Sequence, residues 1–467
     1  MSRTEAPTGA APDQTESVER AEFVVFVDQT DSAERVRRVE FVDQAERVEQ
    51  AESGVAGSRA ADSGPGEAEL VELTIDAVAP GGHCVGRLDG QIVFVRHALP
   101  GERVIAEITE VNRGYLRADA VTVLEPSASR VTPPCPYAGP NRCGGCDLQH
   151  VEPSAQLDWK ADVVREQLRR LGRLTPEEID ALGVRVETLP GGPLGWRSRV
   201  RYAVDAAGRA GLLKHRSHEV VPVDRCLIAH PAIQLLPVLS TDGQRWPTAE
   251  AVETVASTGG DVAVQTVVDG TPVAERGPAT VRELAAGREW QLPPDAFWQV
   301  HPAAADTLVD TVLELLEPRT GERAWDLYGG AGLFAAALAG RVGPTGRVTM
   351  VEAAPSGVAA ARENLTDLGQ VEVVSAKVET ALARRRITGP VDLVVLDPPR
   401  TGAGAEVVRA LTGVGARAIA YVACDPAAFA RDVRIFAEAG WRLVALRGYD
   451  MFPMTQHVEC VGLFTPA

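Results

Sequence analysis

The sequence predicts an α/β protein in which a doubly wound domain follows a small β-barrel and a mixed, β-rich middle domain. Short apolar runs broken by Asp-Gly and Pro-Gly turns from Leu70 onward predict the barrel. Strand-like runs in the middle of the chain predict a mostly β domain. From about Pro293 buried apolar strands alternate with helices, as in a doubly wound sheet. The expected divisions are residues 1–66, 67–126, 127–290 and 291–467.

The composition is that of a soluble globular protein. The chain has 467 residues, of which 45% are hydrophobic and 24% charged, and this excludes a wholly disordered or fibrous protein. No apolar run approaches the ~20 residues of a membrane span, and the first residues lack the apolar core of a secretory signal. We therefore expect a cytoplasmic protein without membrane association. The net charge of −17 disfavours polyanion binding by the whole surface but allows a local basic groove.

Residues 1–66 are predicted to be a disordered acidic tail. This segment carries 14 acidic residues and 7 arginines, and within residues 22–53 the strings EFV, DQ and AERV each occur twice. Its apolar residues are mostly valine and would bury little surface, so the segment cannot offset the entropy of ordering. Residues 57–67 have the composition of a linker.

The predicted barrel resembles a TRAM domain, a compact, OB-like RNA-binding fold. The residues that carry the resemblance are Gly86, Arg87, Gly90, the VFV run at 93–95 and the string ALPGERV at 98–104. The resemblance implies contact with RNA. An unrelated barrel that serves as a spacer is the alternative. Beyond the barrel, apolar positions at helical spacing predict a helix over 154–172 in the middle domain and another over 306–317.

A glycine-rich turn in the third domain predicts a nucleoside-binding site. Residues 326–334, DLYGGAGLF, close one strand and open a helix, where glycines let a ligand approach the backbone. Glu352 ends the next strand and could accept both hydroxyls of a ribose, and Asp397 ends a further strand at the same edge. Phosphate cradling of the P-loop kind is disfavoured because no Walker lysine is present. The pattern resembles class I S-adenosylmethionine-dependent methyltransferases, which have a Rossmann-like domain; nicotinamide binding is the rival, but GGAG lacks the full glycine spacing.

Two later motifs present reactive side chains. Cys424 follows the apolar run AIAYVA and precedes a predicted helix, whose N-terminus would favour the thiolate. A lone cysteine is more often a small buried hydrophobe. Glu459 lies between Val458 and the apolar run VGLF, where a solvated acid is unexpected, so we expect a raised pKa and a role as a base.

These motifs and the string FWQVH at 297–301 closely resemble the RNA (uracil-C5)-methyltransferase family that also carries TRAM domains. The resemblance implies that Cys424 attacks C6 of a uracil, that C5 then accepts a methyl group from S-adenosylmethionine, and that Glu459 removes the C5 proton. It further implies RNA, ribosomal or transfer, as the partner. Separately, we expect a monomer. The positions that match cofactor-contacting residues of the family are Gln299, Tyr328, Glu352 and Asp397. The chain departs from common family residues at His301, Lys377 and Cys460, which leaves its substrate preference open.

Four cysteines outside the catalytic motifs form a candidate metal site. Cys135, Cys143 and Cys146 are clustered in one loop and Cys226 lies farther along the chain. Four thiolates could hold a tetrahedral zinc ion or a cubane cluster, or they could stay unliganded. Some members of the family bind a [4Fe–4S] cluster with a similar set, and the resemblance favours that cluster, although this loop is two residues longer.

Two other functions are compatible with parts of the pattern. The first is an RNA-binding or RNA-folding factor without catalysis, and the second is a methyltransferase that acts on another RNA base or on a protein. Cys424 together with Glu459 favours uracil methylation, because binding alone needs neither residue. The string DPPR at 397–400 replaces the DPPY or NPPY strings that suggest amino-group methylation.

Overall fold

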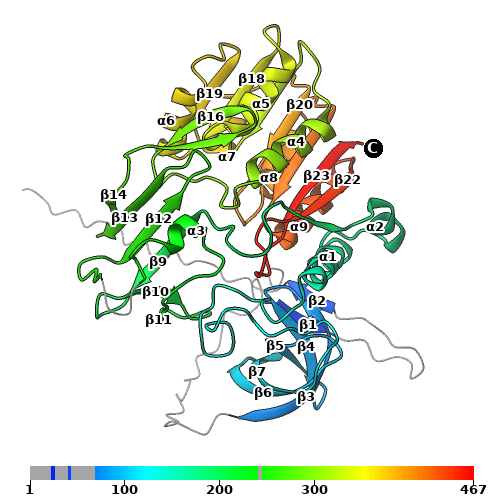
Figure 1. The fold of residues 1–467 in the computed structure, drawn as a ribbon. Coiled ribbons are helices and arrows are strands. Elements are labelled where there is room, and N and C mark those ends of the chain that lie inside the picture. Colours follow the sequence, from blue (N-terminus) through cyan, green and yellow to red (C-terminus); the bar gives the residue numbers. More distant parts are fainter. Residues whose placement is uncertain (1–22, 27–39, 44–68, 240–243) are drawn as a thin grey trace, which may run out of the picture.

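The computed structural model describes residues 23–26, 40–43, 69–239 and 244–467 (Figure 1). Most of the tail predicted to be disordered therefore lies outside the described residues. Within it, β1 (Phe23–Phe26) pairs antiparallel with β2 (Glu40–Asp43). The prediction of a disordered tail remains a prediction. Strand β1 contains the Phe-Val of the first EFV string and β2 contains the second string, and Phe and Val have a high preference for strands.

The predicted small barrel is present. Its five strands close in the order β3-β4-β5-β7-β6, and apolar side chains fill the interior. Buried and more exposed side chains alternate over parts of β3, β6 and β7, as the period-2 pattern predicts, whereas β4 and β5 are buried over most of their length. The barrel strands are β3 (Leu70–Ala79), β4 (His83–Leu88), β5 (Gln91–Arg96), β6 (Arg103–Val111) and β7 (Tyr115–Glu125).

The middle of the chain forms a six-stranded antiparallel sheet in the order β11-β10-β9-β12-β13-β14, which lies beside the C-terminal domain in Figure 1. A separate hairpin, β15–β16, packs its buried face into the core of the C-terminal domain. These elements are β9 (Arg199–Val204), β10 (Ala210–Leu213), β11 (Val220–Pro222), α3 (Pro231–Gln234), β12 (Ala251–Ala256), β13 (Val262–Val268), β14 (Thr271–Arg276), β15 (Val281–Ala285) and β16 (Arg288–Leu292).

The C-terminal domain is the doubly wound α/β sheet that the sequence predicts, in the order β19-β18-β17-β20-β21-β23-β22-β8. Helices cover both faces, and β23 runs antiparallel between β21 and β22. The elements are α4 (Ala304–Leu316), β17 (Arg323–Leu327), α5 (Leu333–Val342), β18 (Arg347–Glu352), α6 (Pro355–Asn364), β19 (Val371–Ser375), α7 (Val378–Ala383), β20 (Leu393–Leu396), α8 (Gly404–Leu411), β21 (Ala418–Ala423), α9 (Pro426–Glu438), β22 (Trp441–Asp450) and β23 (Glu459–Pro466).

Helix α1 (Pro153–Arg170) joins the barrel to the C-terminal domain. Pro153 occupies its first turn and the carboxylate of Glu152 accepts two of its free N–H groups, so the helix starts where the sequence predicts. Trp159 of α1 packs with the barrel core, whereas Leu168 packs with the core of the C-terminal domain. The chain continues through α2 (Pro176–Leu182) to β8 (Val186–Thr188), which pairs with β22.

Two elements that precede the expected division at 290/291 belong structurally to the C-terminal domain: β8 joins its sheet, and β15 packs against its core. Strand β16 runs across that division. Within the described ranges, no helix is long and apolar enough to span a membrane.

Candidate active site

At Gly329 the glycine-rich turn approaches its neighbours too closely for a side chain. A Cβ on Gly329 would lie 2.7 Å from Cγ of Met350 and 2.9 Å from Oδ2 of Asp326. Asp326 is fully buried, and its Oδ2 accepts a hydrogen bond from the N–H of Ala335 in α5. The other oxygen, Oδ1, has no hydrogen-bond partner among the described residues. Burial raises the pKa of Asp326 to about 7, against the smaller opposing effect of the Ala335 N–H.

The strand register brings three of the predicted cofactor residues to one edge. Leu327 pairs with Val351 on one side and with Leu396 on the other. The residues that come directly after these three therefore lie next to one another: Tyr328, Glu352 and Asp397. The carboxylate of Glu352 accepts hydrogen bonds from the N–H groups of Gly330 and Ala354.

Tyr328 has a positive φ of 63°, and its hydroxyl donates to Glu379 at 3.4 Å. Burial raises the pKa of Asp397 to about 7. An acid and an aromatic ring thus flank the glycine turn at the carboxyl edge of the sheet, where ligands bind in doubly wound folds.

Cys424 and Glu459 are brought close together by two neighbouring strands. Strands β21 and β23 are antiparallel, and Ala423 paired to Cys460 is the last pair of their register. Cys424 follows β21 and Glu459 begins β23, so both adjoin this pair, and the charge of Glu459 acts on Cys424. Cys424 is half-buried at the end of β21, and Glu459 is 3% exposed at the start of β23. The two side chains expected to act together are therefore brought together, 35 positions apart in the chain.

The electrostatics of this pair correct one expectation. Cys424 directly precedes Asp425, which caps α9, yet its pKa is raised to about 12. Burial is the main cause, the carboxyl groups of Glu459 and Asp397 add to it, and Arg400 opposes it. The thiolate that the helix N-terminus was expected to favour is thus disfavoured in the free protein. For Glu459 the expectation of a raised pKa is confirmed: burial and Asp397 raise it well above its usual value.

Gln299 lies in a segment that precedes the glycine turn in the chain, and its surroundings differ from those of the other predicted cofactor residues. The segment FWQVH lies between β16 and α4, where the carbonyl of Val300 accepts hydrogen bonds from the N–H and hydroxyl of Ser198. His301 is buried and stacks on Trp196 with ring centroids 6.0 Å apart. Gln299 itself is half-buried, and no hydrogen bond among the described residues ties it to the glycine turn.

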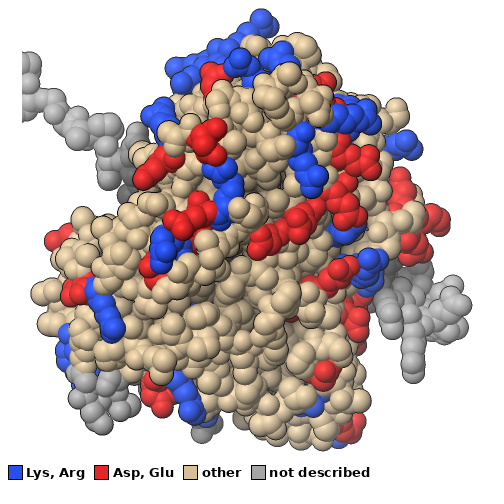
Figure 2. Space-filling model, turned by 45° about the horizontal axis from the view of Figure 1, so that its top comes forward, with Lys and Arg blue, Asp and Glu red and all other residues tan. Residues whose placement is uncertain are grey.

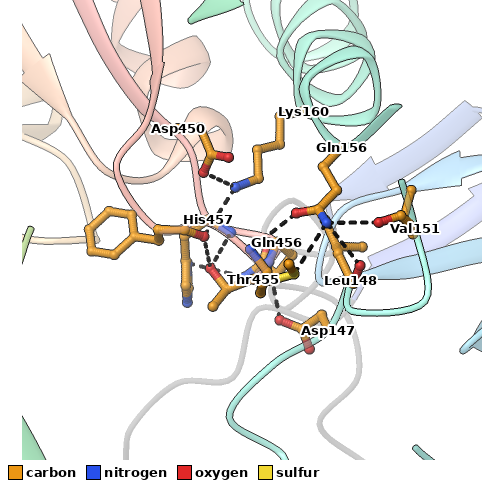
Figure 3. A network of polar contacts seen from close by, with 11 residues as sticks. Asp147, Leu148, Val151, Gln156, Lys160, Asp450, Thr455, Gln456 and His457 are labelled. Carbon is orange, nitrogen blue, oxygen red and sulfur yellow. Dashed lines mark hydrogen bonds and ion pairs between the residues drawn. The ribbon is translucent and has the colours of Figure 1, made fainter. Parts of the chain in front are cut away.

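A buried polar network holds the loop at 451–458, which leads into Glu459 (Figure 3). The ammonium of Lys160 in α1 donates to Asp450 at 2.5 Å and to the carbonyl of Phe452 at 3.2 Å. Gln156, one turn earlier, donates to the carbonyls of Leu148 and Val151, and its amide oxygen accepts from the N–H of Met454.

The same loop is tied to the barrel. The N–H of Gln456 donates to Oδ2 of Asp147, and Arg96 at the end of β5 donates to the other oxygen of Asp147 at 3.3 Å. Gly82 in the turn between β3 and β4 has φ +72°, and a Cβ there would lie 2.6 Å from Cβ of Asp147. The barrel, the loop at 135–147 that carries three of the cysteines, and the loop at 451–458 are thus in direct contact.

The four cysteines of the candidate metal site line one pocket. Cys135, Cys143, Cys146 and Cys226 surround it together with apolar side chains of the middle sheet. Burial raises the pKa of Cys143 to about 11 and raises those of Cys146 and Cys226. In the described part of the chain, no three His, Cys, Asp or Glu side chains are grouped closely enough to hold a metal ion.

Three contributors were missed from the sequence. Arg400 of the DPPR string acts electrostatically on both Cys424 and Glu459. Lys160 is one of only three lysines and falls among the apolar positions of the predicted helix. A lysine on the apolar face of a helix could have predicted a buried charge. Asp450 carried no local signal, because its partner is 290 residues away.

Comparison with known proteins agrees with this site. A family model for the TRAM domain matches residues 67–121, and one for tRNA (uracil-5-)-methyltransferase matches residues 283–466. An uncharacterized RNA methyltransferase of Streptomyces avermitilis is 49% identical over 85% of this chain and 99% of its own length. A 23S rRNA (uracil(1939)-C(5))-methyltransferase of Thiobacillus denitrificans is 34% identical over 82% of this chain and 96% of its own length.

The fold is also that of a solved structure. The Pyrococcus abyssi tRNA (uracil-54, C5)-methyltransferase, in complex with S-adenosyl-L-homocysteine, matches 84% of this chain and 99% of its own with a TM-score of 0.63 and 22% identity. The doubly wound sheet and the closed five-stranded barrel define a class I methyltransferase fold with an added barrel. The chain belongs to the S-adenosylmethionine-dependent RNA (uracil-5-)-methyltransferase family with a TRAM domain.

Proposed function

We propose that the protein methylates C5 of a specific uridine in ribosomal or transfer RNA through a covalent bond between Cys424 and C6 of the uracil. One observation carries the proposal. Cys424 and Glu459, which would serve as nucleophile and base, both adjoin the last residue pair of β21 and β23, and the carboxyl group of Asp397 lies close enough to act electrostatically on both. A protein that only bound RNA would need neither group at this edge.

The reaction follows from the electronic structure of uracil. C5 is too electron-poor to accept a methyl group unaided, so the Cys424 sulfur, once deprotonated, adds to C6 and makes C5 nucleophilic. When bound, S-adenosylmethionine supplies the electrophilic methyl group. Glu459 then removes the C5 proton, the C5–C6 double bond re-forms, and the sulfur leaves C6. The target base must be unstacked to reach this edge.

The residues at the edge fit an S-adenosylmethionine molecule. The buried Oδ1 of Asp326 has no partner among the described residues and is available to a donor on the ligand. Glu352 uses its two oxygens on backbone N–H groups but keeps lone pairs for ribose hydroxyls. We propose that Gln299, Tyr328, Glu352 and Asp397 contact this ligand.

We also propose a [4Fe–4S] cluster held by the four cysteines that line one pocket, Cys135, Cys143, Cys146 and Cys226. A single zinc ion would need its sulfurs ~3.8 Å apart, from a Zn–S distance of about 2.3 Å and tetrahedral geometry. A [4Fe–4S] cluster is held by four cysteine thiolates, and four cysteines line this pocket, although no three of them are grouped closely in the described part of the chain. The proposed role is structural, because methyl transfer needs no redox step.

The test is nucleoside analysis of RNA treated with the protein. Unmodified ribosomal and transfer RNA transcripts are incubated separately with the full chain and S-adenosylmethionine, digested and analysed by mass spectrometry. We expect 5-methyluridine in one of the two RNAs and none with Cys424→Ala. Absence of 5-methyluridine from both RNAs, or methylation of another base, overturns the proposal. The cytoplasmic location and monomeric state suggested by the sequence remain predictions.

A further inference from the structure

Asp432 in α9 is a buried carboxylate that the proposed mechanism does not use. At the surface, side chains of opposite charge lie interspersed, as the face in Figure 2 shows. Asp432 is instead 3% exposed, and the groups that donate to it are neutral N–H and O–H groups. Burying a carboxylate is costly unless hydrogen bonds satisfy it, so the segments that supply these donors show what the side chain holds in place.

The donors come from two segments. Oδ2 of Asp432 accepts hydrogen bonds from the hydroxyl of Tyr421 at 2.7 Å and from the N–H of Ala403 at 2.8 Å. The N–H of Gly404, the first residue of α8, donates to Oδ1 at 3.2 Å. Because Ala403 offers α8 no side-chain cap, Asp432 supplies the acceptor and the negative charge that a helix N-terminus favours. One side chain of α9 thus joins the start of α8 to β21.

The turn that leads into α8 approaches Asp432 closely. Gly402 has a φ of +85°, and a Cβ there would lie 2.8 Å from Oδ2 of Asp432. The N–H of Gly402 donates to the carbonyl of Pro399 at 2.9 Å, which closes a β-turn with Arg400 at its second position. Arg400 therefore lies in a turn whose C-terminal end rests on Asp432.

Arg400 also lies between two anchors of its segment. The N–H of Asp397 donates to the carbonyl of Leu327 at 3.2 Å, which ties the start of the segment to β17. The hydrogen bond from Ala403 to Asp432 ties the other end to α9. The side chain of Arg400 is exposed, and among the described residues no hydrogen bond or ion pair holds its guanidinium group. The position of that group therefore depends on the backbone around it, and loss of the second anchor would free Arg400 but not Asp397.

The charge of Arg400 acts on both reactive groups of the candidate active site. Burial raises the pKa of the Cys424 thiol, the carboxyl groups of Glu459, Asp397 and Asp425 add to this rise, and Arg400 opposes it. Burial and Asp397 raise the pKa of Glu459, and Arg400 opposes that rise as well. A fixed guanidinium group here favours the deprotonated forms that the chemistry needs.

We infer that Asp432, together with Tyr421, is a positioning residue that holds the turn of Arg400 so that its guanidinium group stays near Cys424 and Glu459. This role rests on the proposed function in that Cys424 and Glu459 are taken as nucleophile and base. Both members of the network belong to the elements that flank the nucleophile. Tyr421 lies in β21 three residues before Cys424, and Asp432 lies in α9, which begins two residues after Cys424.

The test compares how fast anionic iodoacetate and neutral iodoacetamide alkylate Cys424 in the full chain at low salt. Mass spectrometry follows the tryptic peptide 418–431, in which Cys424 is the only cysteine. Access to the thiol and its pKa affect both reagents alike, whereas a positive charge nearby attracts only iodoacetate. The ratio of the two rates, iodoacetate over iodoacetamide, therefore reports whether Arg400 is in place.

Asp432→Ala should lower this ratio about threefold, because the freed turn lets Arg400 move away. Removal of the negative charge of Asp432 by itself would raise the ratio. Arg400→Gln should lower the ratio by the same factor, and Arg400→Gln/Asp432→Ala should lower it no further. Asp432→Asn keeps an oxygen that can accept the two N–H groups and should restore much of the ratio. Glu438→Gln, which removes an exposed acid from the same helix, should match the wild type.

A wild-type ratio in folded Asp432→Ala, or a further decrease in the double variant, overturns the inference and leaves the proposed function standing. A cooperative thermal transition shows that each variant is folded. If Asp432→Ala does not fold, Tyr421→Phe decides: it keeps the ring that packs on Phe429 but loses the hydroxyl, and it should lower the ratio about twofold. An unchanged ratio in Tyr421→Phe would then overturn the inference. The measurement uses neither RNA nor S-adenosylmethionine, so a lowered ratio in a protein that forms no 5-methyluridine would overturn the proposed function alone.

Discussion

The ammonium group of Lys160 and the carboxylate of Asp450 form an ion pair 2.5 Å long with side-chain exposures of 0% and 5%. It connects α1, which packs on the barrel with one face, to the end of β22, from which the chain turns toward Glu459 (Figure 3). Burial lowers the pKa of Lys160, and the charge of Asp450 opposes that shift. A buried pair of this kind is costly to separate, because each partner alone would be a buried, unpaired charge.

Replacing Lys160 should therefore destabilise the fold. Lys160→Met leaves Asp450 without its cation, and we expect a loss of about 3–5 kcal/mol in the free energy of unfolding. The double variant Lys160→Met/Asp450→Leu removes both charges and should recover much of that loss. Urea unfolding monitored by circular dichroism measures the free energy of unfolding of both variants. A Lys160→Met protein as stable as the wild type would show that the ion pair does not stabilise the fold.

The raised pKa values of the catalytic pair predict a rising pH profile. The thiol of Cys424 has a pKa of about 12 and the carboxyl of Glu459 one well above its usual value, and both groups react in their deprotonated forms. Loss of protons is favoured as pH increases, so kcat/KM for RNA should increase between about pH 6 and 9. Initial rates of methyl transfer over this pH range test whether kcat/KM increases. A flat or falling pH profile would contradict the roles of Cys424 and Glu459.

Removing the base should stall the reaction after methyl transfer. In Glu459→Gln the sulfur can still add to C6 and C5 can still accept the methyl group, but the C5 proton has no acceptor. We expect a protein–RNA adduct to accumulate on ordinary RNA, visible as a shifted band on a denaturing gel. Glu438→Gln, an exposed acid on α9, is the control and should turn over normally. Wild-type turnover by Glu459→Gln would assign the proton to another group.

Loss of one cysteine should empty the proposed cluster site. Anaerobically purified protein should contain about four irons per chain and absorb broadly in the visible range. Cys226→Ser removes one of the four sulfurs that line the pocket, so this variant should lose the iron. We expect its thermal stability to decrease more than its affinity for S-adenosylhomocysteine. Cys84→Ser, in the barrel core, should retain it. Stoichiometric zinc in place of iron, or unchanged iron in Cys226→Ser, would refute the cluster assignment.

The sequence predicted the parts of the site that depend on local patterns. Asp397 and Cys424 follow strongly apolar strands, and the carboxyl ends of such strands meet at one edge in a doubly wound sheet. Glu459 was found because an acid inside an apolar run is unusual. The helix at 304–316 had a clear period and two boundaries, and it lies within one or two residues of its prediction.

What could not be predicted depends on contacts between distant segments. The helix N-terminus beside Cys424 is visible in the sequence, but the burial that raises the pKa of this thiol, and the carboxyl groups of Glu459 and Asp397 that add to it, arise only on folding. Strand β8 has three residues and no periodic signal, so its pairing with β22 could not be foreseen.

The covalent step is tested most directly with RNA that contains 5-fluorouridine. Fluorine at C5 cannot leave as a proton does, so the bond between sulfur and C6 persists after methyl transfer. Incubation with S-adenosylmethionine, digestion and mass spectrometry should find methylated fluorouridine attached to the peptide that contains Cys424, and Cys424→Ala should form no adduct. An adduct on Cys460 or another cysteine, or turnover of ordinary RNA by Cys424→Ala, would contradict the account.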